Sequence, residues 1–269
     1  MGTGIVSVSL SLDEREVVSR ILLVAAAALY AALAPGFRPS PAAVAATAVL
    51  GARVTLLGWN RVALVLLVAA LGVWLLQLGQ MHAALRSVTG SAFMPTVATE
   101  SLAVLAALQP HPALVDASLV PWALGLALYV RAVAGFELKQ LAHGRGDHWI
   151  AGGALAISTL ATATIADALD MAHAPFADVS FALWAIAMLW LVVLVVAELA
   201  SPRLRGDDRR WSTVFPLGMY AACSFVTATA VGAHQIADFA RVWVWVAVFV
   251  WLAVAVRQGA SMSSRSSAN

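Results

Sequence analysis

Apolar stretches separated by short polar turns run through almost the whole of this sequence. The stretch 211–232, WSTVFPLGMYAACSFVTATAVG, is apolar and long enough to cross a bilayer as a helix of about 20 residues. Only 11% of the residues are charged, whereas soluble domains have about a quarter. The sequence therefore predicts an all-α integral membrane protein.

Ten such stretches predict ten transmembrane helices, with cores near 1–12, 17–34, 42–57, 62–76, 91–108, 119–135, 149–169, 181–199, 211–232 and 242–256. The first is too short to span, which indicates either a helix truncated at its N-terminus or a short interfacial helix. We expect a single transmembrane domain over 1–259 and a disordered cytoplasmic tail over 260–269.

The stretches alternate in composition. The even-numbered cores, with the second counted from residue 21, contain no Ser or Thr and hold most of the tryptophans, whereas the odd-numbered ones carry hydroxyl and small residues. Bulky apolar and aromatic side chains suit lipid, while small and hydroxyl residues suit a bundle interior. This predicts five hairpins, each with one outer and one inner helix, and the inner five could ring a central pore. Close helix packing without a pore is the alternative interpretation.

Anion passage along such an axis would need hydrogen-bond donors, because the inner stretches carry only one cation, Arg53. Hydroxyl groups, backbone N–H groups freed at proline kinks and helix-end dipoles can supply them. The candidate pore-lining residues are Gly4, Ser7, Thr47, Gly51, Thr96, Thr99, Glu100, Gly153, Ser158, Thr162, Pro216, Gly218 and Ala222.

Glu100 is an ionisable residue inside a predicted span, which is a signal of function by default. It is a candidate proton site or a candidate member of an ion pair, with Arg53 as the possible partner. Both interpretations are open at this level.

Phe215 precedes Pro216, which lacks an N–H and is expected to kink the ninth helix. The Phe215 ring could plug a pore at the bend or fill the gap that the kink leaves. Helical spacing allows two stripes to face the axis, one with Phe215, Gly218, Ala222, Phe225 and Thr229, the other with Thr213, Pro216, Tyr220, Ser224 and Thr227.

Loop charges orient the chain. With the N-terminus inside, the outer side holds five of the 16 Lys and Arg residues, and the cytoplasmic side holds the other eleven. This satisfies the positive-inside rule and places both termini in the cytoplasm, with the protein in the cell membrane. The bilayer and small anions are the expected partners.

The sequence disfavours several classes of function. Net charge is only +2 and the basic residues fall in loops, so nucleic acid is not the implied partner. No inner stretch carries a nucleophile–base pair or a metal-ligand cluster, and the chain has a single cysteine, Cys223. We therefore expect neither an enzyme nor a cofactor or metal site.

The segments MGTGIVSV, MPTVATESLAVLAAL, DHWIAGGALAISTLA and WSTVFPLGMY together resemble the tellurite-resistance/C4-dicarboxylate transporter family, over nearly the whole chain. That family includes bacterial TehA and the slow anion channels of plants. The resemblance implies five hairpins around a central pore, a homotrimer, passage of small anions and a phenylalanine gate on the ninth helix, which corresponds to Phe215. Glu100 stands where the family pattern leads us to expect a neutral amide.

The expected function is an anion channel or exporter. A proton-coupled C4-dicarboxylate or sulfite carrier is the alternative, and a non-transporting membrane scaffold or intramembrane enzyme is a third.

Overall fold

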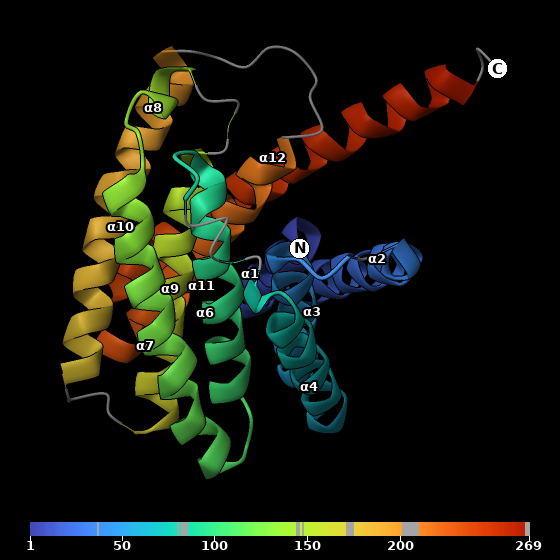
Figure 1. Cartoon of the computed structure of the whole chain (residues 1–269). Helices are drawn as coiled ribbons and strands as arrows, with labels where there is room; N and C mark the ends of the chain where they lie inside the picture. The colour runs from blue at the N-terminus through green and yellow to red at the C-terminus, as the bar shows by residue number, and fades with distance from the viewer. Residues whose placement is uncertain are drawn as a thin grey trace.

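The computed structural model of the chain describes residues 1–36, 38–79, 81, 86–143, 146, 148–170, 175–200 and 210–266. These residues are nearly all helical, and none of them forms a strand, which confirms the all-α prediction (Figure 1). Among them, six helices are long and apolar enough to cross a membrane, and Gly2–Leu12, Pro41–Thr55 and Asn60–Leu76 are shorter apolar helices. The count of ten spans stays a prediction.

Consecutive helices pack as hairpins. The pairs are α1 (Gly2–Leu12) with α2 (Glu16–Leu33), α3 (Pro41–Thr55) with α4 (Asn60–Leu76), α6 (Met94–Ala107) with α7 (Pro112–Gly135), α9 (His148–Ala168) with α10 (Pro175–Ala200), and α11 (Trp211–Val231) with α12 (His234–Ser266). Short helices, η1 (Ala34–Gly36), η2 (Gly90–Phe93) and α8 (Gln140–His143), lie in the connections.

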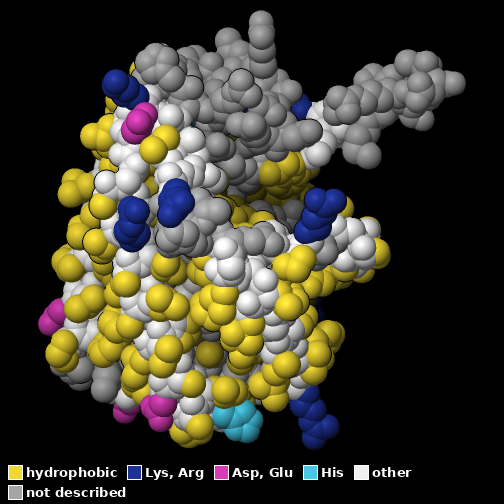
Figure 2. Space-filling model, in the orientation of Figure 1, with side chains coloured by type: hydrophobic (Ala, Val, Ile, Leu, Met, Phe, Trp, Pro, Cys, Tyr) yellow, Lys and Arg dark blue, Asp and Glu magenta, His cyan; other side chains and the backbone are white. Residues whose placement is uncertain are grey.

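The hairpins form two shells. The first helix of each pair belongs to the inner shell, and these five contact one another in the closed order α1, α3, α6, α9, α11 and back to α1. In α9, 94% of the span is buried inside the molecule, compared with 22% in its partner α10. Hydrophobic side chains cover much of the visible outer surface, as suits a molecule surrounded by acyl chains (Figure 2).

The inner helices all run in the same direction, because each hairpin begins with its inner helix and the outer helix returns the chain. Their N-termini therefore lie at one end of the molecule and their C-termini at the other. Aligned peptide dipoles make the N-terminal end of such a ring electropositive.

Two of the prolines act differently from each other. Pro95 occupies the first turn of α6, where the backbone N–H has no helical acceptor, so this proline starts the helix without kinking it. Pro216 lies inside α11, as predicted, and cannot donate to the carbonyl of Ser212.

Candidate functional site

A wide cavity of about 770 Å³ lies at the N-terminal end of the inner shell. The first turns of α1, α6, α9 and α11 contribute Gly4, Met94, Ile150 and Ser212 to its wall, and Phe215 lies one turn further along α11. The middle of α3 and the outer helices α2 and α12 contribute further residues. We call this cavity the vestibule.

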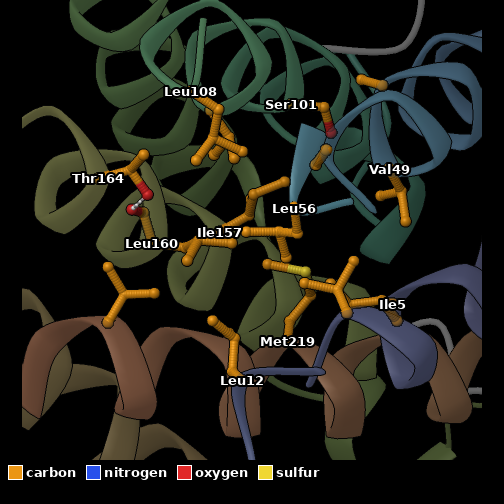
Figure 3. Close-up of a pocket in the computed structure, with 15 residues that line it drawn as sticks. Ile5, Leu12, Val49, Leu56, Ser101, Leu108, Ile157, Leu160, Thr164 and Met219 are labelled. Atoms are coloured by element: carbon orange, nitrogen blue, oxygen red, sulfur yellow. Dashed lines mark hydrogen bonds between the residues drawn. The ribbon is translucent and has the colours of Figure 1, made fainter. Parts of the chain in front are cut away.

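A second, narrow cavity of about 50 Å³ lies among the inner helices, all five of which line it; we call it the central cavity (Figure 3). Its lining residues are Ile5, Val8, Leu12, Ala48, Val49, Ala52, Leu56, Ser101, Val104, Leu108, Ile157, Leu160, Thr164, Met219 and Val226. A cavity bounded by the whole inner ring lies on the axis of that ring.

Phe215 lies on α11 one turn before Met219, the first residue of that helix to line the central cavity. Its side chain lines the vestibule, is only 3% exposed, and is followed one turn later by Met219, which lines the central cavity. Pro216 lies in the turn between them and contacts α9: a Cβ added to Gly153 would be 2.9 Å from Pro216 Cγ. Phe215, Pro216 and Met219 therefore lie within about one turn of α11.

The α11 residues that line the central cavity, Met219 and Val226, belong to neither of the two predicted stripes, and of the first stripe only Phe215 lines the vestibule. The second stripe turns partly toward α10: Ser224 Oγ accepts a hydrogen bond of 2.9 Å from Trp184 Nε1, and Thr227 Oγ1 lies 3.0 Å from Ser180 Oγ.

Five hydroxyl groups of the inner helices join one hairpin to the next. In five places an aromatic N–H or O–H of an outer helix pairs with a hydroxyl on the inner helix of the next hairpin, and the fifth pair returns to the first hairpin. The pairs are Tyr30–Thr47 (2.8 Å), Trp74–Thr99 (2.9 Å), Trp122–Thr162 (2.9 Å), Trp184–Ser224 (2.9 Å) and Trp251–Thr3 (3.0 Å). We call this set the aromatic belt.

The belt explains why several predicted pore-lining residues lie off the axis. Thr47, Thr99 and Thr162 are members of the belt and line neither axial cavity. Ser7 also faces outward, since its hydroxyl donates to the backbone carbonyl of Ser19 on α2 at 2.7 Å.

The predicted glycines allow inner helices to approach closely. A Cβ added to Gly51 would lie 2.5 Å from Leu105, and one added to Gly218 would lie 2.8 Å from Ile5. Gly4 packs against Val49 and also lines the vestibule.

Two other predicted residues are buried in the inner shell. Ala222 is fully buried in the main apolar cluster. Thr96 Oγ1 is buried with no hydrogen-bond partner among the described residues. Neither of them lines the axial cavities.

The aliphatic lining of the central cavity was missed by sequence reasoning, because the composition of the inner helices drew attention to hydroxyls. The signal that could have found it is spacing: Ile5, Val8 and Leu12 recur at helical intervals along α1. The same intervals relate Ile157 and Leu160 on α9.

Glu100 is fully buried where α6 meets α7 and α9. Its Oε1 accepts a hydrogen bond of 3.0 Å from Ser158 Oγ, and its Oε2 has no partner among the described residues. A Cβ added to Gly125 of α7 would lie 2.6 Å from the Glu100 carboxyl group, so the glycine makes room for it. Neither Glu100 nor Ser158 lines the axial cavities.

Arg53 is equally buried but has a different partner from the expected one. Its guanidinium pairs with Glu16 Oε1 at 2.8 Å and donates to Ser19 Oγ at 2.9 Å, both on α2. The structure therefore brings Arg53 to Glu16 and not to Glu100.

Comparison with known proteins adds to this geometry. A family model described as SLAC1, voltage-dependent anion channel, matches residues 39–258, from the start of α3 into α12. Two curated relatives in Mycobacterium tuberculosis are similar to part of the chain: the uncharacterized membrane protein MT1776 of strain CDC 1551 / Oshkosh and the uncharacterized membrane protein Rv1735c of strain ATCC 25618 / H37Rv. Each is 34% identical over 117 residues, a match that covers 39% of this chain and 58% of the relative, so the chain spans little more than half the length of these relatives.

Proposed function

Because this chain belongs to the SLAC1 family of voltage-dependent anion channels, we propose that it passes small anions along the axis of the inner shell, as a channel or exporter. The observation that carries the proposal is that successive turns of α11 line two cavities, with Phe215 on the vestibule and Met219 on the central cavity that all five inner helices bound. A conduit bounded by all five inner helices is the arrangement that the family and the helix pattern both lead us to expect.

Anions are favoured in the vestibule by the direction of the inner helices. Each helix N-terminus carries a partial positive charge of about half an elementary charge, and unpaired backbone N–H groups point out of it. The first turns of four inner helices line the vestibule, so their dipoles act on the same space. No fixed side-chain cation is needed to attract an anion there.

Phe215 is the proposed gate. Phe215 lines the vestibule four residues before Met219, which lines the central cavity, and in the proposed gate rotation of the ring would open the way from one cavity to the other. Pro216 leaves one carbonyl of this turn without its helical donor, which makes local movement of α11 easier.

Reconstituted protein tests the gate. Phe215→Ala is expected to raise chloride flux and planar-bilayer current several-fold over wild type, because the ring no longer blocks the passage. Phe225→Ala is the matched control, since it removes the same ring from the same helix at a buried position that lines neither axial cavity. Unchanged or lower current in folded Phe215→Ala would contradict the gate. Measuring chloride, nitrate, sulfite, malate and succinate identifies the anions that pass.

A proton-coupled C4-dicarboxylate or sulfite carrier is the second candidate, and the observation that favours it is the buried Glu100 carboxyl with one unpartnered oxygen. In a carrier, an imposed pH gradient would drive uptake in wild type, and Glu100→Gln would abolish the effect. If the pH gradient changes uptake by neither wild type nor Glu100→Gln, transport is not coupled to protons. Single-channel currents would indicate a channel, and saturable counterflow would indicate a carrier.

We also place the protein in the cell membrane with both termini in the cytoplasm, as a homotrimer, with residues 1–259 as the membrane domain and 260–269 as the tail. Loop charge supports the orientation, and family resemblance supports the trimer. Native mass spectrometry in detergent measures the assembly. A scaffold or an intramembrane enzyme would give no anion flux in wild type or in Phe215→Ala.

A further inference from the structure

The wall of the central cavity has almost no group that could bind an ion. Residues from all five inner helices line it, none of them is charged, and most are aliphatic. The two hydroxyls are already committed to their own helices: Ser101 Oγ donates to the carbonyl of Val97 at 2.7 Å, and Thr164 Oγ1 donates to that of Leu160 at 2.8 Å. An anion there would find no free donor on the side chains.

The chemistry of the cavity wall also disfavours water, although the cavity is large enough to hold it. A volume of about 50 Å³ exceeds the ~10–15 Å³ that one water requires, but a buried water also needs two to four polar partners. In Figure 3 the side chains of Ile157, Leu56 and Met219 lie toward one another from three different helix segments, and they present only carbon and sulfur. Because the wall offers a water molecule too few hydrogen-bond partners, we expect this space to be dry.

We infer that the central cavity is a second barrier to ions, in series with Phe215, and that it acts by excluding water. Hydrophobic constrictions are known to gate channels by dewetting. The inference rests on the proposed anion pathway: an anion that passed Phe215 would have to shed its hydration shell with no donor to replace it. Opening the gate at Phe215 is then insufficient for full conduction.

Met219 is the residue at which this barrier can be tested with least change of shape. Met219→Gln keeps a similar length and adds an amide that can both donate and accept hydrogen bonds, whereas Met219→Leu changes shape by a similar amount and remains apolar. In the Phe215→Ala background, Met219→Gln is expected to raise chloride flux at least ten-fold over Phe215→Ala alone, and Met219→Leu is expected not to. Ile157→Asn is the second variant if Met219→Gln does not fold.

A labelling experiment tests dryness without relying on conduction. The single native cysteine, Cys223, is replaced by alanine, and Val104→Cys places a thiol in the central cavity. A charged methanethiosulfonate reagent is expected to leave this thiol unmodified, with or without Phe215→Ala, and to modify it once Met219→Gln is added.

The outcomes separate the two proposals. Labelling of Val104→Cys in the Phe215→Ala protein, or equal flux through the Met219→Gln and Met219→Leu proteins, would overturn the second barrier. If labelling follows the expected pattern while no variant passes any anion of the panel, the barrier to water stands and the proposed function fails.

Discussion

At the scale of single residues, the inner shell is organised by pairs in which a small residue admits a large or polar one. Gly125 and Glu100 are the clearest pair, because the carboxyl group occupies the space that a side chain on α7 would take. Ser158 then supplies one hydrogen bond to the same carboxyl. This fit holds an otherwise costly group in the membrane interior.

Gly125→Ala is therefore expected to destabilise the protein by about 1–3 kcal/mol, since the new methyl group would overlap the Glu100 carboxyl. Thermal unfolding in detergent measures the change. Gly72→Ala on α4 is the control, because a Cβ there meets nothing within 4 Å. Adding Glu100→Ala should remove the overlap and restore stability. If the double variant stays as unstable as Gly125→Ala, overlap with the Glu100 carboxyl is not the cause.

At the scale of helices, the aromatic belt connects each hairpin to the next. A buried indole N–H needs an acceptor, and a hydroxyl on the neighbouring inner helix supplies it. The same contact accounts for the alternation seen in the sequence, with tryptophans on one set of helices and hydroxyls on the other.

Trp122→Phe removes one bond of the belt while keeping most of the ring. Interhelical hydrogen bonds in membranes contribute about 0.6 kcal/mol on average, so we expect a loss of that order. A double-mutant cycle with Thr162→Val should show a coupling of the same size. Trp245→Phe changes a side chain that is 47% exposed and should leave the midpoint of thermal unfolding unchanged. A coupling of zero would mean that the Trp122–Thr162 contact does not join the hairpins energetically.

At the scale of the whole molecule, the hairpins close into a ring with two unlike ends. Trp251 of the last hairpin bonds to Thr3 of the first, so the closure involves both ends of the chain. On the visible face, most Lys and Arg side chains gather toward the end where α8 lies, while the His side chain and most of the Asp and Glu side chains lie toward the opposite end (Figure 2). This polarity agrees with a cytoplasmic vestibule.

Cysteine labelling tests that orientation. In a Cys223→Ala background, Gly36→Cys lies at the vestibule end, between α2 and α3, and His111→Cys lies at the turn between α6 and α7. A membrane-impermeant maleimide added to intact cells should label His111→Cys and spare Gly36→Cys, and permeabilised cells should show both. The reverse pattern in intact cells would place the vestibule outside.

Much of the fold was accessible to sequence reasoning. The predicted span 149–169 agrees with α9 at His148–Ala168, because a long apolar run in lipid can satisfy its backbone only as a helix. Errors occurred at helix starts: α7 begins at Pro112, well before the predicted 119, because proline is favoured in a first turn. The candidate site was harder, since Phe215 and Gly4 line the vestibule but Thr99 and Thr162 face outer helices.

What the sequence determined by itself is the helical class, the pairing into hairpins and the separation of two shells, because length, hydropathy and the placement of hydroxyls act locally along the chain. Only the tertiary structure decided which side of each inner helix meets the axis. Hydroxyls turned toward the indoles of neighbouring hairpins, where buried donors needed acceptors, and aliphatic side chains were left to fill the centre. That choice depends on partners far apart in the chain, which the composition of a single helix does not contain.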